Sequence, residues 1–170
     1  NGAAKVCAVD VGHGQLHPSL MNRQEVISLE GMNVRDLDTE KIGYTPDFVC
    51  CDVSFISLTV VIEKLPNLLA ESCECVLLIK PQFEAGREQV GKKGIVREKK
   101  VHIQVAENVV KYAVENGLKP AGFTYSPVTG AKGNIEYLLY IDGKIEKGEE
   151  FDTEFLKITD VVNTSHEELE

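Results

Sequence analysis

Residues 76–84 read VLLIKPQFE, an apolar run that ends in Lys80 and is followed at once by Pro81. An apolar run of this length bounded by a proline is typical of a strand buried on both faces of a parallel α/β sheet. Pro81 has no amide hydrogen to give to a neighbouring strand, so we expect the strand to end there. Lys80 would then lie at the carboxyl end of the strand, where open α/β sheets bind their ligands. The alternative interpretation is a lysine that extends from a strand end into water.

Apolar strand-like segments alternate with helix-like segments along the rest of the chain, which indicates a parallel sheet with crossover helices. Strands are expected at residues 5–11, 26–29, 48–53, 76–79, 121–128 and 135–142. Helices are expected at residues 58–69, where Pro66 should bend or end the helix, and at residues 101–115, ahead of Gly117. The last two strands suggest a hairpin. The sheet is therefore expected to be mostly parallel, with one antiparallel strand.

The composition is that of an ordinary globular protein of one domain, with 43% hydrophobic and 26% charged residues in a chain of 170. No apolar run is long enough for a membrane span, and residues 1–12 lack the features of a signal peptide. The five cysteines are odd in number and follow no disulfide or zinc-binding spacing. We therefore predict a cytoplasmic protein without a metal site.

The net charge of −9 is unevenly distributed. Residues 142–170 hold ten acidic and three basic residues and carry −7 of it, whereas residues 80–100 hold seven basic and three acidic residues. A basic loop beside a site at Lys80 is a plausible contact surface for phosphate groups. If the ligand that carries these phosphates is an RNA, the loop residues expected to bind it are Arg87, Lys92, Lys93 and Arg97. The alternative is a solvated loop without a partner.

Asp10 lies near the end of the first expected strand. In nucleoside-binding sheets, an acidic residue at the end of the second strand takes the ribose hydroxyls, about 20 residues after a glycine-rich loop. That loop would lie before residue 1, so the chain is expected to lack the first strand of its sheet. Gly12 and Gly14 flank His13 in a segment that we interpret as a turn. Asn33 is suited either to contact an adenine edge or to form a turn.

Two further carboxylates stand near expected strand ends. Asp52 lies among apolar residues in FVCCDVSFISL, and buried aspartates are rare unless they are paired or functional. Glu136 follows a turn in GNIEYLL, and either belongs to the surface of an alternating strand or points into the same cleft as Lys80. The four histidines show no ligand spacing.

The strings AVDVGHGQL, CDVSFISL, LIKPQFEAGRE, GIVRE and SPVTGAKGNIEYLLY are very similar to the TlyA family, often named haemolysin A. These bacterial proteins are S-adenosylmethionine-dependent ribosomal RNA 2′-O-methyltransferases whose catalytic domain is related to FtsJ. The resemblance implies a Rossmann-like methyltransferase domain over residues 1–142, incomplete at its amino end, and an acidic tail over residues 143–170. It also implies methylation of cytidine ribose hydroxyls in ribosomal RNA.

The family's catalytic tetrad is Lys, Asp, Lys and Glu, and the resemblance places its last three members on Asp52, Lys80 and Glu136. The first lysine, the glycine-rich loop and a small S4-like RNA-binding domain are expected upstream of residue 1. Binding of S-adenosylmethionine is expected of Asp10, Val11, Gly12, Asn33, Val34 and Asp52. The expected partners are ribosomal RNA and ribosomal subunits, with no membrane. Lys80 would be either the base for the ribose hydroxyl or a charged group that positions it.

Three other functions compete with this one. A nicotinamide-dependent oxidoreductase would use Asp10 equally well, but gives no role to the set of Asp52, Lys80 and Glu136. A membrane-lytic protein needs an inserting segment, which a chain of mean hydropathy −0.11 does not offer. A ribosome-binding module that kept the methyltransferase fold without its activity is the remaining alternative.

Overall fold

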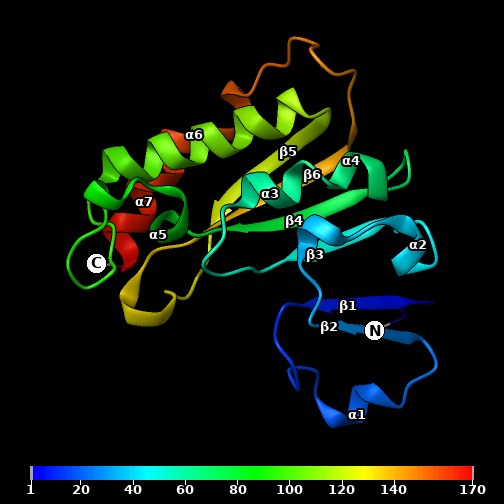
Figure 1. Ribbon diagram of the computed structural model, residues 1–170. Helices are drawn as coiled ribbons and strands as arrows, with labels where there is room; N and C mark the ends of the chain where they lie inside the picture. Colours follow the sequence, from blue (N-terminus) through cyan, green and yellow to red (C-terminus); the bar gives the residue numbers. More distant parts are fainter. Residues whose placement is uncertain (1, 170) are drawn as a thin grey trace. The chain divides into compact units, whose positions relative to one another are not determined.

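A computed structural model describes residues 2–169 and divides into two compact units, one ending at Thr45 and the other beginning at Pro46 (Figure 1). Each unit has its own sheet, of two strands in the first and four in the second. Within the described residues, no helix has both the length and the apolar character that a membrane crossing requires.

The first unit is built on two parallel strands, β1 (Val6–Asp10) and β2 (Val26–Glu30), with Asp10 paired opposite Glu30. Its short helices are α1 (Pro18–Met21), η1 (Val34–Asp36) and α2 (Thr39–Ile42). The Asp38 carboxylate caps the start of α2 by accepting a hydrogen bond from the backbone of Lys41. Gly43, at φ 77°, ends α2 in the left-handed conformation that glycine adopts most easily.

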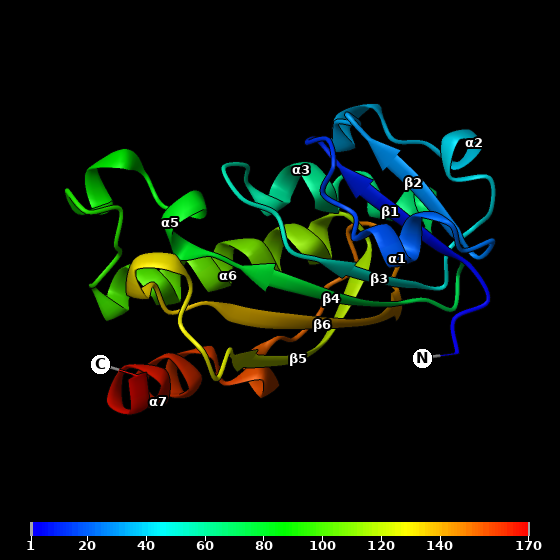
Figure 2. The ribbon, with the colours of Figure 1, turned by 90° about the horizontal axis from the view of Figure 1, so that it is seen from below.

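The second unit contains the sheet predicted around Lys80. Its strands are β3 (Phe48–Cys51), β4 (Glu74–Ile79), β5 (Leu118–Tyr125) and β6 (Tyr137–Lys144). Strands β3 and β4 are parallel, whereas β6 runs antiparallel to both β4 and β5. The spatial order is β3-β4-β6-β5, so the antiparallel strand lies inside the sheet, between β4 and β5 (Figure 2). This position brings the start of β6 next to the end of β4.

The helices of the second unit are α3 (Leu58–Ile62), α4 (Leu65–Leu68), α5 (Pro81–Glu84), η2 (Arg87–Gln89), α6 (Lys99–Glu115), η3 (Ala131–Gly133), η4 (Glu154–Leu156) and α7 (Ile158–Leu169). The helix predicted at residues 58–69 is thus two short helices. Pro66 stands in the first turn of α4, where backbone amides have no partner within the helix, so its missing amide hydrogen breaks no hydrogen bond. In one continuous helix the same position would have lost a backbone hydrogen bond. The helix predicted at residues 101–115 is confirmed as α6.

The core lies on one face of this sheet. Cys75, Leu77 and Ile79 of β4 alternate inward and are fully buried, as are their partners in β6. Helix α6 packs on β5, and α7 packs on both α6 and β5. The opposite face of β4, with Val76 and Leu78, is only half-buried. The prediction of a strand buried on both faces is therefore wrong for the second face.

The acidic tail contains the helix α7. Val162 and Ser165 of α7 are fully buried. The hydroxyl groups of Ser165 and Tyr137 are 3.2 Å apart, and His102 Nδ1 of α6 is 2.8 Å from the same Tyr137 hydroxyl. This buried polar cluster joins α6, α7 and the first residue of β6, which follows Glu136.

Candidate active site

Lys80 lies at the carboxyl end of β4 and forms an ion pair with the residue that follows β3. Its Nζ atom is 2.6 Å from Asp52 Oδ1 and donates a hydrogen bond to Ser54 Oγ at 3.1 Å. The two strands are parallel, so their ends reach the same edge of the sheet. The interpretation of Lys80 as a lysine extending into water does not hold, because its side chain is only 12% exposed.

Asp52 is the exposed member of the ion pair. The prediction of a buried carboxylate is wrong, since the Asp52 side chain is 70% exposed. The expected strand was too long: β3 ends at Cys51, which leaves Asp52 in the loop that follows. The lysine, which the sequence left ambiguous, is the partner that is largely removed from water. The cost of placing its ammonium there is offset by a carboxylate and a hydroxyl.

Glu136 is buried, with 7% of its surface exposed, so the alternative of a surface carboxylate is excluded. Ile79 pairs with Tyr137 in the antiparallel ladder, and the next pair in that register is Lys80 and Glu136. Glu136 Oε1 nevertheless accepts its hydrogen bond from Gln82 Nε2, at 3.0 Å. Among the described residues, no hydrogen bond or ion pair joins Glu136 to Lys80.

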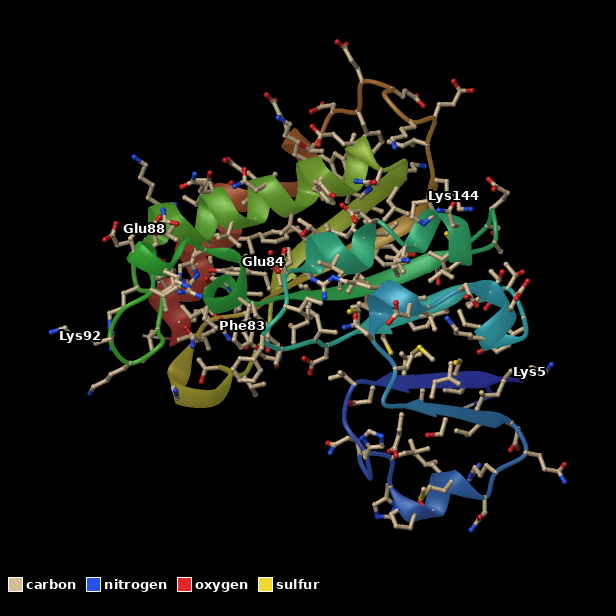
Figure 3. All side chains as sticks on the ribbon, viewed as in Figure 1. Lys5, Phe83, Glu84, Glu88, Lys92 and Lys144 are labelled. Carbon is tan, nitrogen blue, oxygen red and sulfur yellow. The ribbon has the colours of Figure 1, made fainter. Side chains whose placement is uncertain are left out.

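Helix α5, which follows Lys80, is hydrogen-bonded to the start of α3, which follows the loop that carries Asp52. Glu84 accepts hydrogen bonds from Ser57 Oγ and from the Leu58 backbone, both at 2.7 Å, at the start of α3. Burial raises the pKa of Glu84, and these two hydrogen bonds oppose that effect only in part. In Figure 3, Phe83 and Glu84 are labelled on α5.

Phe55 was not recognised from the sequence as a site residue. It lies in the loop that carries Asp52 and Ser54, its φ is 64°, and it is 90% exposed. An aromatic residue with positive φ is unusual and strained, and such strain is found mostly at functional sites. The Phe55 and Phe83 rings are 4.9 Å apart, and both line a pocket of about 590 Å³ with Gln82, Ala85, Arg87 and Val90. The available signal was an aromatic residue three positions after Asp52, directly following Ser54.

The basic loop between α5 and α6 exposes all four of the residues predicted to bind RNA. Lys92, Lys93 and Arg97 line one hollow, together with Glu88 and Glu98, and Lys92 extends outward from the loop (Figure 3). Arg87 lines the pocket beside Phe55 instead. Asn134 holds the loop in place, accepting from the Val96 backbone at 3.2 Å and donating to the Gly94 carbonyl at 2.9 Å. The structure thus groups these cations on one loop, and their RNA contacts stay a prediction.

The residues expected to bind the cofactor's nucleoside lie in the first unit, apart from Asp52. Asp10 is exposed at the end of β1, and its Oδ1 accepts a hydrogen bond from the Gly12 backbone at 2.7 Å. Asn33 caps η1 by accepting from the Arg35 backbone at 3.0 Å. Val11 and Gly12 continue from Asp10, and Val34 is the first residue of η1. The turn interpretation of Asn33 is therefore confirmed, and the adenine contact stays a prediction.

Glu30 is a second residue that sequence reasoning missed. Its carboxylate accepts hydrogen bonds from three backbone amides, those of Gly14 at 2.8 Å, Gln15 at 2.8 Å and Leu16 at 3.1 Å. These bonds lower the pKa of Glu30 because they favour its charged form. The loop after Asp10 is thus a turn held by a carboxylate, as the turn interpretation of its glycines predicted. The available signal was an acidic residue at the end of β2, opposite Asp10.

Sequence comparisons identify relatives over most of the chain. The protein named rRNA methyltransferase YqxC of Bacillus subtilis is 41% identical over 172 residues, covering 99% of this chain and 60% of the relative. The 16S/23S rRNA (cytidine-2′-O)-methyltransferase TlyA of Mycobacterium tuberculosis is 42% identical over 140 residues, covering 82% of this chain and 52% of the relative. The chain therefore spans between 52% and 60% of the length of these two relatives.

Structural comparisons agree. A solved structure described as a hemolysin from Streptococcus thermophilus superposes with a TM-score of 0.91 at 41% identity, covering 99% of this chain and 60% of that chain. The N-methyltransferase NodS from Bradyrhizobium japonicum superposes with a TM-score of 0.55 at 12% identity, covering 82% of this chain and 66% of that chain, a likeness of fold alone.

The predicted fold and the resemblance to TlyA proteins are confirmed by these matches. The FtsJ-like methyltransferase family matches residues 1–142, far more than half of the sequence. The chain belongs to the FtsJ-like methyltransferase family.

Proposed function

We propose that the protein, in its full-length form, transfers a methyl group from S-adenosylmethionine to the ribose 2′-hydroxyl of cytidine in ribosomal RNA. The observation that carries the proposal is the Lys80–Asp52 ion pair at the carboxyl end of β4, with the buried carboxylate of Glu136 next in register. The family and the names of the relatives support the reaction class.

The cofactor would be held at its nucleoside by residues of the first unit. Asp10 has an exposed carboxylate at a strand end, the position from which acidic residues of such sheets bind a ribose diol. The Gly12 backbone amide orients that carboxylate, and Glu30 holds the loop that follows. S-adenosylmethionine would supply an electrophilic methyl group on a sulfonium.

Lys80 would act on the hydroxyl that receives the methyl group. Asp52 and Ser54 hold its side-chain nitrogen, at 2.6 Å and 3.1 Å. We therefore assign Lys80 as a positioning donor, which binds the 2′-oxygen and stabilises the negative charge that develops on it. As the new O–C bond forms, the bond between the methyl carbon and sulfur would break and S-adenosylhomocysteine would leave as a neutral thioether. The hydroxyl loses its proton in the same reaction, and the carboxylates of Asp52 and Glu136 are suited to accept it.

The substrate nucleotide would be held by aromatic and basic groups beside Lys80. Phe55 offers an exposed ring in the loop of Asp52, and aromatic rings of this kind stack nucleobases without strict sequence preference. Arg87 lines the same pocket, and the basic loop beyond it would contact phosphates, which position an RNA without specifying its sequence.

The test is to identify the product. Full-length protein would be incubated with ribosomal subunits and methyl-labelled S-adenosylmethionine, and the RNA digested to nucleosides for mass spectrometry. The proposal predicts 2′-O-methylcytidine as the labelled product. A label on a base, or binding of ribosomal subunits without binding of S-adenosylmethionine, would contradict it; the second result would favour a non-catalytic module.

A further inference from the structure

Pro81 separates two polar side chains that serve different carboxylates. On one side of it, Lys80 pairs with Asp52 at 2.6 Å; on the other, Gln82 donates to Glu136 Oε1 at 3.0 Å. Pro81 is buried and its ring fixes its backbone φ, so the two side chains are held on a rigid segment. The backbone positions from which the two side chains extend are therefore constrained relative to each other.

The Glu136 carboxylate has little freedom. It is buried, and a Cβ atom built on Gly130 would clash with it, so the glycine leaves the space that the carboxylate fills. A buried carboxylate needs hydrogen-bond donors in place of the water it has lost, and the Gln82 amide supplies one. Gly130 leaves room for the Glu136 carboxylate, and the hydrogen bond from Gln82 orients it.

The second polar atom of Gln82 argues against a purely structural role. Gln82 Oε1 is buried and has no hydrogen-bond partner among the described residues. Buried side-chain polar atoms are usually satisfied, and an unsatisfied one weakens the fold. An apolar side chain of the same length would avoid that cost, so the benefit of the amide at this position lies with its donor, which meets Glu136.

We propose that Gln82 is a positioning residue for the methyl transfer, an inference that rests on the proposed function. Its amide holds the Glu136 carboxylate by a hydrogen bond, although Glu136 faces Lys80 in the strand register. Lys80 then has one carboxylate partner, Asp52, and its ammonium keeps a hydrogen available for the 2′-oxygen of the substrate.

The test is a double-mutant cycle in the full-length protein. Gln82→Met removes the donor at nearly the same side-chain length, and is combined with Glu136→Gln. Loss of a hydrogen bond to a charged group predicts a fall in kcat of roughly tenfold to a hundredfold for Gln82→Met. The KM for ribosomal subunits and the Kd for S-adenosylmethionine should change by less than about threefold, since the lost interaction acts in the reaction and not in binding. The exposed Gln104 of α6 offers a matched control, Gln104→Met, which should leave kcat unchanged.

If Gln82 acts through Glu136, then Gln82→Met should lower kcat by less than about twofold in the Glu136→Gln background. Equal losses in both backgrounds would overturn the assignment. The unfolding midpoints of the same four proteins give a second measurement. If the Gln82–Glu136 contact exists, the changes in midpoint caused by the two substitutions must be non-additive. This measurement does not require the Glu136→Gln variant to be active. If the wild-type protein transfers no methyl group, the proposed function falls, and with it the role of Gln82. Additive effects in an active wild type overturn the role of Gln82 alone.

Discussion

Lys80 and Glu136 occupy facing positions one step beyond the last pair of the β4–β6 ladder, yet each bonds to a different residue. Lys80 pairs with Asp52, and Glu136 with Gln82. Two carboxylates on one lysine would bind its ammonium hydrogens and compete with a substrate hydroxyl. Separation of the two carboxylates leaves the lysine available as a donor.

Phe55→Ala should lower methyl transfer to ribosomal subunits while leaving the Kd for S-adenosylmethionine unchanged. Loss of a stacking platform costs about 1–3 kcal/mol, which corresponds to roughly fivefold to 150-fold in rate. Single-turnover methylation would measure it. Phe55→Gly should lose activity equally, yet raise the thermal unfolding midpoint, because glycine adopts a φ of 64° without strain. Full activity in both variants would contradict a stacking role.

Replacement of Lys92 and Lys93 by glutamine should weaken RNA binding at low salt. Each phosphate contact contributes nearly one unit to the slope of log K against log salt, so the slope should become shallower by about one to two units. Fluorescence anisotropy with a ribosomal RNA fragment over a salt series would measure this slope. Lys111→Gln, on the exposed face of α6, is the control. A slope identical to that of the wild type would exclude phosphate contacts by the two lysines.

Glu84→Gln should change the pH dependence of stability in one direction. Burial raises the pKa of Glu84 above its usual value near 4.5, so the folded protein binds this proton more tightly than the unfolded chain. The stability that Glu84 contributes is thus fully present below the unfolded pKa and is lost as pH rises through the folded pKa. The free energy of unfolding of the wild type, minus that of the variant, should fall as the pH rises from the usual carboxyl value through the raised pKa of Glu84.

Urea unfolding at several pH values would measure this difference, with the exposed Glu107→Gln on α6 as the control. A difference that stays constant, or that grows toward neutral pH, would show that Glu84 is not held in the environment described.

Much of the fold follows from residues 76–84. The apolar run and Pro81 correctly placed Lys80 at a strand end, because a proline cannot continue a ladder. The position of β6 inside the sheet could not be predicted, since hydrophobic periodicity gives a strand's existence and not its neighbours. The same gap explains why the two alternatives for Glu136 stayed open: its burial depends on pairing with β4, a contact distant in sequence.

The site was predicted less completely than the fold. Asp52 and Lys80 were expected to lie together, but the exposed fractions of their side chains were not predicted. The predicted end of β3 was two residues too late, so Asp52 was placed in the strand although it lies in the loop that follows. Gln82 and Phe55 carry no charge pattern that marks them in the sequence. Gln82 stands out through its partner, Glu136, and Phe55 through its backbone conformation and exposure.

The central claim, that Lys80 acts in methyl transfer, is tested most directly by Lys80→Ala in the full-length protein, with Lys111→Ala as the control. Single-turnover methylation of ribosomal subunits would be measured beside isothermal titration with S-adenosylmethionine. Loss of a group that assists proton transfer or stabilises the developing charge predicts a rate at least about 100-fold below the wild type. The cofactor Kd should stay within about threefold, as expected for a group that acts in the transition state. Methylation by Lys80→Ala at the rate of the Lys111→Ala control would contradict the account.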